Sequence, residues 1–319
     1  MVKTIRAHTN IALIKYWGKA DSHLRLPLMS SLSMTLDQFY TDTKISASDE
    51  DCFILNGIRQ KNVSAQRVFS FLKVLQQKFG VTGHLLVEST NNVPTAAGLA
   101  SSSSAFAALA GAFCAHYNIQ LTPIELSRIA RLGSGSACRS IYGGFSVWQK
   151  GTDDKSSYAY ALDENPQIDL QLLAVELNTK QKRISSTAGM KMAQSSPFFQ
   201  PWLLRNQQEL EQMISAVKAQ DFTAIGSLAE LNATEMHAVN LTARPSFTYF
   251  EPATIKAIKM VSELRQNGIE CYFTIDAGPN IKILSQLKNV KDITNKFVTE
   301  FENVKIINAS FGPGISYLN

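Results

Sequence analysis

The sequence predicts an α+β fold with two lobes. Strand patterns dominate the first half of the chain, whereas the second half is mostly helical and holds only a few short strands. A run of strands followed by a run of helices is typical of α+β proteins, in which the two kinds of element segregate instead of alternating. We therefore expect an N-terminal mixed β/α domain over residues 1–180 and a C-terminal helical domain with a small antiparallel sheet over residues 181–319.

The elements of the first half follow from the periodicity of apolar side chains. Residues 62–79 place apolar side chains on one helical stripe, and Gly80 can adopt the left-handed conformation that ends a helix. Thr122 opens a capping box with proline at the first helical position. In chain order we expect strands at 4–14, 27–46, 52–57, 85–89 and 144–148, helices at 62–79, 106–113 and 122–131, and a short helix after 133.

The second half begins with residues 170–177, a nearly continuous apolar run that indicates a central strand. After it the pattern becomes helical, with an expected antiparallel helix pair at 199–219 and 222–236. The remaining expectations are helices at 252–266 and 290–301 and strands at 271–275, 281–284 and 304–308, the last of which completes the chain.

Composition limits the classes of function that the chain can have. Of its 319 residues 45% are hydrophobic and 18% charged, which is typical of a soluble globular protein. The net charge of +5 is spread along the chain, so we expect no nucleic-acid partner. No apolar run is long enough to span a membrane, and no signal peptide opens the sequence. The four cysteines never occur in Cys-x-x-Cys spacing, so we expect reduced thiols and a cytoplasmic protein.

Residues 93–105 join a strand to a helix through small residues, and we expect a phosphate site there. The first N–H groups of a helix have no partner within it, and the helix dipole is positive at that end. Gly98 lets the backbone approach a ligand, while the serines at 101–104 offer hydroxyls to phosphate oxygens or to Mg²⁺. The alternative is a serine-rich cap on a buried helix, although one hydroxyl would suffice for that. The stretch is neither a Walker loop nor a dinucleotide-binding turn.

A few polar residues stand where a strand meets a turn and could face a cleft. Each has a structural alternative: Lys15 and Lys19 could lie on a solvated surface, Arg139 could form a structural ion pair, and Asp276 could start a turn. Spacing alone does not bring Lys15 next to Asp276, so these roles stay open at this point. The full set is Lys15, Tyr16, Lys19, Ser134, Ser136, Arg139, Ser186 and Asp276.

An ordered set of short motifs resembles the GHMP kinase superfamily, in particular its mevalonate diphosphate decarboxylase branch. The central Pro-x-x-x-Gly-Leu-x-Ser-Ser pattern spans residues 94–102. The Ile-Lys-Tyr-Trp-Gly-Lys block ends at Lys19, and the Asp-Ala-Gly-Pro turn begins at Asp276. Further blocks lie, in order, at 31–33, 133–140, 184–186 and 236–237, so the resemblance covers nearly the whole chain.

The resemblance implies a two-lobed GHMP kinase fold and an ATP-dependent decarboxylation. Mevalonate 5-diphosphate would be phosphorylated on its tertiary 3-hydroxyl and would then lose phosphate and CO₂ to give isopentenyl diphosphate. Asp276 matches the catalytic aspartate, with Lys15 keeping it ionised, and Arg139 matches the residue that holds the substrate carboxylate. The expected homodimer is also implied by the resemblance.

The resemblance further assigns the binding residues. Residues expected to bind the mevalonate substrate are Tyr16, Lys19, Ser134, Gly135, Ser136, Arg139, Ser186 and Thr187. Residues expected to bind ATP are Pro94, Ala97, Gly98, Leu99, Ala100, Ser101 and Ser102, of which Ser101 and Ser102 would also meet Mg²⁺.

Two positions depart from the family pattern. Many relatives have asparagine where Met29 stands, and many have arginine where this chain has Thr187. The second change removes a cation from the expected diphosphate pocket. It therefore leaves a decarboxylase of mevalonate monophosphate as an alternative. Two further alternatives are a small-molecule kinase of the same superfamily and a ligand-binding protein without catalysis.

Overall fold

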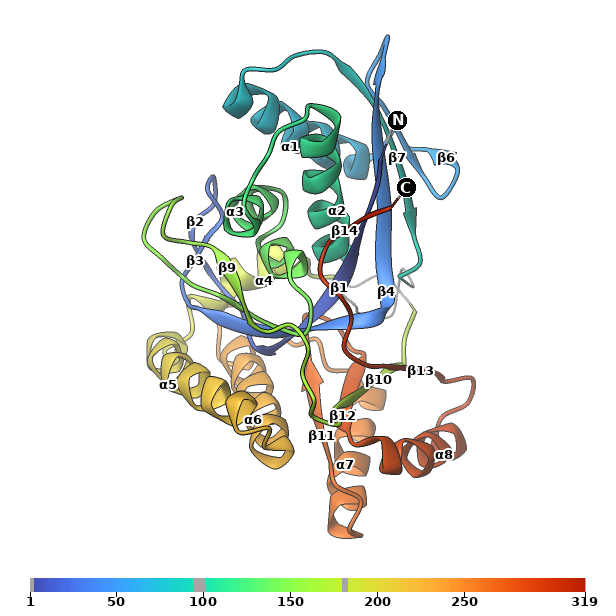
Figure 1. Ribbon diagram of the computed structural model, residues 1–319. Coiled ribbons are helices and arrows are strands. Elements are labelled where there is room, and N and C mark those ends of the chain that lie inside the picture. The colour runs from blue at the N-terminus through green and yellow to red at the C-terminus, as the bar shows by residue number, and fades with distance from the viewer. Residues whose placement is uncertain (1–2, 94–100, 180–182, 319) are drawn as a thin grey trace.

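The computed structural model describes residues 3–93, 101–179 and 183–318 (Figure 1). An eight-stranded sheet organises the N-terminal lobe, with the strand order β14-β1-β4-β7-β5-β6 and with β8 and β9 attached beside β4. Its members are β1 (Thr4–Ile14), β4 (Ser31–Ser48), β5 (Cys52–Leu55), β6 (Ile58–Arg59), β7 (His84–Asn91), β8 (Phe145–Trp148), β9 (Ala159–Asp163) and β14 (Ser316–Leu318).

Strand β4 is 18 residues long and pairs with three neighbouring strands. Its first part pairs with β8, its second part pairs with β7, and β1 runs antiparallel along its other edge. The ladder between β1 and β4 is irregular after His8 and after Ala12. Ile14, the last residue of β1, is still paired with Leu32, and the chain beyond it continues to the short hairpin of β2 (Lys19–Asp21) and β3 (Leu26–Pro27).

Helices α1 (Val63–Phe79), α2 (Ser101–His116) and α3 (Pro123–Gly133), together with the 3₁₀ helix η1 (Gly135–Ile141), pack on this sheet (Figure 1). Helix α2 is apolar on nearly all sides and buries eleven residues, because it lies between the sheet and the other helices. Helix α3 begins with the expected capping box at Thr122 and Glu125.

A four-stranded antiparallel sheet, ordered β11-β12-β10-β13, organises the C-terminal lobe. Its strands are β10 (Gln171–Glu176), β11 (Cys271–Ile275), β12 (Ile281–Ser285) and β13 (Lys305–Ala309). The helices of this lobe are α4 (Ser186–Ala193), α5 (Phe199–Lys218), α6 (Phe222–Leu241), α7 (Pro252–Gln266) and α8 (Val290–Glu300), with η2 (Leu287–Asn289) before α8. None of the helices among the described residues is long and apolar enough to cross a membrane.

Two apolar cores lie on opposite faces of the small sheet. Leu173, Phe273 and Ile283 pack with helices α7 and α8 on one face. On the other face Leu284 and Tyr272 join side chains of α5, α6 and strand β1 in a single cluster. The two lobes therefore share a core, and the C-terminal ends of β1 and β11 meet at its edge.

The structure agrees with most of the expected elements and adds some. Residues 170–177 contain an inner strand, as predicted, and α5 and α6 pack against each other. Strands β9 and β14 were not expected, and β14 corrects the prediction that residues 304–308 hold the last strand. β10, before residue 180, belongs to the C-terminal sheet, because it pairs with β12 and β13. β14, at the end of the chain, belongs to the N-terminal sheet, because it pairs with β1. The two sheets therefore do not divide the chain at a single residue. The domain division at residue 180 stays a prediction.

Candidate active site

An aspartate held by two lysines lies where the two lobes meet. Asp276 follows β11 and accepts a hydrogen bond from Lys15 Nζ at 2.7 Å through Oδ1. Lys282 Nζ, from β12, lies 3.2 Å from Oδ2. Lys15 follows directly on β1, 261 positions away from Asp276 in sequence. The structure thus brings together two residues whose proximity the sequence left open.

The charges of this group are set by burial and by mutual attraction. The side chains of Lys15 and Lys282 are 2% and 1% exposed, whereas that of Asp276 is 24% exposed. Burial alone would raise the pKa of Asp276, but the ammonium groups of Lys15 and Lys282 outweigh it and hold that pKa well below its usual range. Burial lowers the pKa of Lys15, and Asp276 offsets part of this effect.

Side chains of α5 and α6 fix the backbone of Lys15. Its N–H donates to Asn232 Oδ1 at 2.7 Å, and its carbonyl accepts from Asn206 Nδ2 at 3.4 Å. Asn232 in turn donates to Glu209 Oε2 at 2.7 Å. Burial raises the pKa of Glu209 to about 7. The backbone of Lys15, just beyond the end of β1, is therefore held by hydrogen bonds to buried side chains of α5 and α6.

Arg139 lies in η1, and the residue is only 2% exposed. It donates to Asn10 Oδ1 at 3.2 and 3.3 Å, to Ser33 Oγ at 3.0 Å, and to Ser31 Oγ. Asn10 is held in turn by Ser140 at 2.7 Å. These partners of the arginine are all neutral, so they orient the cation without neutralising it.

Tyr16 presents a buried hydroxyl that has no hydrogen-bond partner among the described residues. Its ring packs edge-on against Trp148, with the ring centroids 4.6 Å apart. A Cβ at Gly135 would lie 2.8 Å from the Trp148 ring and 3.0 Å from the Tyr16 hydroxyl, so only glycine fits between them. The close approach of Gly135 thus helps to fix the position of the tyrosine ring.

Lys19, on β2, donates to Thr187 Oγ1 at 3.2 Å, next to Ser186 at the start of α4. Burial lowers the pKa of Lys19, and the charges of Arg25 and Arg67 lower it further. Burial and the charge of Arg67 lower the pKa of Arg25 in the same way. The hairpin β2–β3 and helix α1 thus gather three cations that repel one another, beside a hollow lined by Arg25, Arg67 and Leu132.

The four serines at the start of α2 divide into two pairs. Ser103 and Ser104 are fully buried, and they bond to the strands β1 and β4 beneath the helix. Ser102 instead lies 3.3 Å from the hydroxyl of Ser134, which is 3.4 Å from that of Ser136. Ser101 and Ser102 are partly exposed. The expected ATP-binding residues Pro94, Ala97, Gly98, Leu99 and Ala100 lie outside the described residues.

Several residues of this site were missed from the sequence. Lys282 could have been noticed as a polar residue inside an apolar strand, where a side chain must find a polar partner. Arg25 and Asn232 carry no such signal, because each is placed by packing between distant elements.

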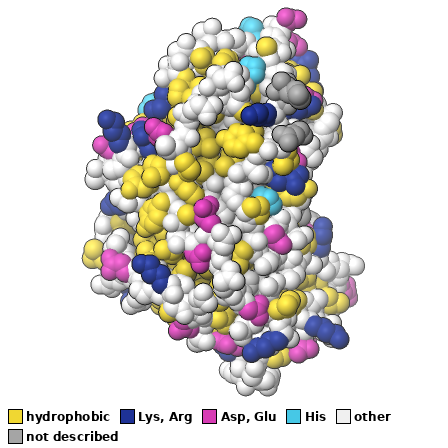
Figure 2. All heavy atoms as spheres, in the orientation of Figure 1, with side chains coloured by type: hydrophobic (Ala, Val, Ile, Leu, Met, Phe, Trp, Pro, Cys, Tyr) yellow, Lys and Arg dark blue, Asp and Glu magenta, His cyan; other side chains and the backbone are white. Residues whose placement is uncertain are grey.

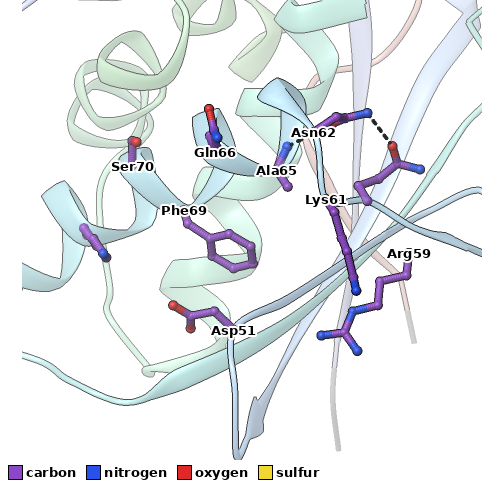
Figure 3. Close-up of a pocket in the computed structure, with 10 residues that line it drawn as sticks. Asp51, Arg59, Lys61, Asn62, Ala65, Gln66, Phe69 and Ser70 are labelled. Carbon is purple, nitrogen blue, oxygen red and sulfur yellow. Dashed lines mark hydrogen bonds between the residues drawn. The ribbon is translucent and has the colours of Figure 1, made fainter.

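Two other surface features lie apart from these residues. Figure 3 shows a hollow at the start of α1, where Asn62 caps the helix, and none of the site residues named above lines it. Arg59 at its rim is paired with Glu50 at 2.7 Å. In Figure 2 hydrophobic side chains gather in a band across the middle of the visible face.

Comparison with known proteins identifies the family. A model described as the diphosphomevalonate decarboxylase-like N-terminal domain matches residues 7–159. A model of the mevalonate 5-diphosphate decarboxylase C-terminal domain matches residues 172–313. The chain belongs to this decarboxylase family. The predicted family, the enzyme class and the two-lobed GHMP kinase fold are therefore confirmed.

Individual members of the decarboxylase family resemble the chain over its whole length. The diphosphomevalonate decarboxylase of Ganoderma lucidum is 34% identical over 337 residues, which cover 97% of this chain and 84% of that protein. The mevalonate diphosphate decarboxylase of Enterococcus faecalis is 45% identical, with a TM-score of 0.93 and coverage of 100% of this chain and 99% of that one. A solved complex described as MDDEF with MVAPP, AMPPCP and magnesium is 45% identical, with a TM-score of 0.95 and the same coverage.

Proposed function

We propose that this site carries out the ATP-dependent decarboxylation of mevalonate 5-diphosphate to isopentenyl diphosphate, with release of ADP, phosphate and CO₂. The observation that carries the proposal is the ionised Asp276 between Lys15 and Lys282, close to the buried cation of Arg139. A tertiary alcohol is a poor leaving group, so it must be phosphorylated before the carboxylate can depart. The site offers one anion for the hydroxyl and one cation for the carboxylate.

Asp276 holds the 3-hydroxyl of the substrate by accepting its hydrogen bond. A carboxylate whose pKa lies well below the usual range is a weak base, so its main contribution is to orient the hydroxyl for transfer. Arg139 holds the substrate carboxylate in a fork-to-fork contact that fixes C1 for its departure. Its neutral partners keep the guanidinium plane in place before the substrate arrives.

The 5-diphosphate is bound by Tyr16, Lys19, Ser186 and Thr187, with Ser134, Gly135 and Ser136 lining the passage to it. The buried hydroxyl of Tyr16 has no partner of its own, and Lys19 has Thr187 as a neutral one. Lys19 can exchange this neutral partner for a phosphate oxygen, and the Tyr16 hydroxyl can donate where a phosphate oxygen reaches it. The same pocket decides between a monophosphate and a diphosphate substrate.

Thr187→Arg should lower the KM for mevalonate 5-diphosphate and leave kcat nearly unchanged. A charge-assisted hydrogen bond contributes about 1.5–3 kcal/mol, against roughly 1 kcal/mol for a neutral one, and the contact exists equally in ground and transition states. Steady-state kinetics on both phosphates checks this, with the exposed Thr299→Arg as the control for added charge. If the natural chain decarboxylates the monophosphate more efficiently than the diphosphate, it belongs to the alternative decarboxylase.

ATP and Mg²⁺ fit the region between α2 and the hairpin β2–β3. ATP supplies the phosphoryl group, and Mg²⁺ offsets the charge of its phosphates. The N-terminus of α2 offers backbone N–H groups and the hydroxyls of Ser101 and Ser102, which suit phosphate oxygens and a hard cation. Lys19, Arg25 and Arg67 supply positive charge nearby. Among the described residues no cluster of three His, Cys, Asp or Glu forms a protein-only metal cage.

Ser101→Ala and Ser102→Ala should raise the KM for ATP or lower kcat, with little effect on the KM for the mevalonate substrate. Their hydroxyls are partly exposed at the helix start, so their loss should not disturb the fold as the loss of Ser103 would. Kinetics with varied ATP and varied Mg²⁺ tests this, and the exposed Ser227→Ala is the matched control. A selective rise in the KM for mevalonate 5-diphosphate would mean that Ser101 and Ser102 bind the mevalonate substrate and not ATP.

The reaction itself is tested by incubating the purified protein with ATP, Mg²⁺ and mevalonate 5-diphosphate. Release of CO₂ with one equivalent of ADP supports the decarboxylase. ADP without CO₂ would support a kinase, and neither product would support a binding protein.

The protein is a cytoplasmic homodimer in this proposal. Cys52, Cys114, Cys138 and Cys271 are free thiols, which suits a reducing compartment. The hydrophobic band on the face shown in Figure 2 is of the kind that self-association covers. Sedimentation equilibrium measures the oligomeric state, and a monomer at micromolar concentration would contradict the proposed homodimer.

A further inference from the structure

Lys282 lies in a place where a lysine is costly. It is the second residue of β12, paired with Thr274 of β11 on one side and Ala174 of β10 on the other. Its side chain is 1% exposed and shares the face of the sheet on which Leu284 joins the core between the lobes. A buried ammonium is tolerated only where it is paired and hydrogen-bonded. The acid that it meets there is Asp276, at 3.2 Å.

The two lysines divide the carboxylate between them. Lys15 contacts Oδ1 and Lys282 contacts Oδ2, so neither oxygen can move without losing an ion pair. Both ammonium groups are buried, whereas 24% of the Asp276 side chain is exposed. A carboxylate has about four lone-pair sites, so two remain for a ligand after each lysine has taken one.

We propose that Lys282 is a positioning residue for the reaction: it holds the carboxylate oxygen that Lys15 does not, and so fixes the plane of Asp276 towards the substrate hydroxyl. This inference rests on the proposed role of Asp276. In this role Lys282 acts on the substrate through Asp276, to which its ammonium is paired at 3.2 Å. The ammonium of Lys15 is held by the Ala12 carbonyl at 2.9 Å as well as by Asp276. Removal of Lys282 should therefore impair the orientation of Asp276 and leave substrate binding largely intact.

Lys282 also acts on the charge of Lys15. The groups that face Lys15 are Asp276 after β11, Lys282 on β12, Arg139 in η1 and His237 on α6. Burial, with Lys15 nearby, lowers the pKa of His237 to about 3, so its ring is neutral. The charges of Lys282 and Arg139 lower the pKa of Lys15. Loss of Lys282 removes one of these positive charges, and the Asp276 carboxylate then pairs with Lys15 without Lys282. Both changes should raise the pKa of Lys15.

The experiment compares Lys282→Met, Lys282→Arg and the natural chain over pH 6 to 10, with the exposed Lys305→Met on the same sheet as the control. We expect Lys282→Met to fold and to lose roughly 10- to 100-fold in kcat, as for a misplaced reacting group, with KM values changed much less. In Lys282→Met the fall of kcat at alkaline pH should move to higher pH. Lys282→Arg should restore both the value of kcat and the pH at which kcat falls. Lys282→Gln takes the same test if the methionine variant does not fold.

A double-mutant cycle with Asp276→Asn separates this proposal from the one on which it rests. If Lys282 acts through Asp276, adding Lys282→Met to Asp276→Asn should change the residual kcat little. An additive loss, a natural kcat in Lys282→Met, or a fall of its kcat at the same alkaline pH as in the natural chain overturns the positioning role. Full activity in Asp276→Asn would instead overturn the role of Asp276 itself.

Discussion

Asp276→Asn should lower kcat by roughly 100-fold or more, because the substrate hydroxyl loses the charged acceptor that orients it for transfer. The amide keeps the shape of the side chain but loses its charge, so it can no longer attract the substrate hydroxyl between Lys15 and Lys282. Steady-state kinetics with mevalonate 5-diphosphate measures the loss. The exposed Asp49→Asn serves as the control and should behave like the natural chain. An Asp276→Asn variant with more than about a tenth of natural activity removes Asp276 from the mechanism.

The same variant should change how stability depends on pH. The pKa of Asp276 is depressed in the folded chain, so its charge stabilises the fold above the ordinary aspartate range, about pH 4. That contribution is lost as the pH falls towards the native pKa. Asp276→Asn should therefore be less stable at neutral pH, because two buried ammonium groups lose their counter-charge. Its free energy of unfolding in urea should also fall less steeply below about pH 4.

Arg139→Lys should be nearly as damaging as Arg139→Ala, with a loss of roughly 100-fold or more in kcat/KM for the mevalonate substrate. Two charge-assisted hydrogen bonds to the carboxylate contribute about 1.5–3 kcal/mol each, and a lysine offers a point charge in place of a planar fork. The guanidinium is also matched to Asn10 and Ser33, which would be left with unsatisfied groups.

The control for this pair is Arg59→Lys, because Arg59 is exposed, is paired with Glu50, and lines a hollow that contains none of the site residues. Circular dichroism should show that both Arg139 variants keep their secondary structure. A nearly natural kcat/KM in Arg139→Lys, beside a damaged Arg139→Ala, would mean that Arg139 contributes only its charge and that the carboxylate clamp is wrong.

Sequence reasoning succeeded where the signal is local. The capping box at Thr122, the helix ending at Gly80 and the strand at 271–275 all follow from side-chain period and end signals within one element. It missed β14, whose three residues are too few to show alternation and which is stabilised by pairing with β1. The helix-start pattern offered the hydroxyls of all four serines to a ligand, and only the resemblance singled out Ser101 and Ser102; in the structure Ser103 and Ser104 face the sheet.

By itself the sequence determined the family, through short motifs in fixed order, and with it a predicted set of residues for the reaction. Only the tertiary structure decided which of them meet. Lys15 and Asp276 are 261 positions apart and become neighbours because α6 packs against both β1 and β11. The second cation on Asp276, Lys282, comes from the strand that pairs with β11. The periodicity of side chains within a helix or strand depends only on nearby residues, so the sequence shows it directly. The cluster of charges around Asp276 depends on which elements pack together in the core, and this packing is established only when the two lobes fold together.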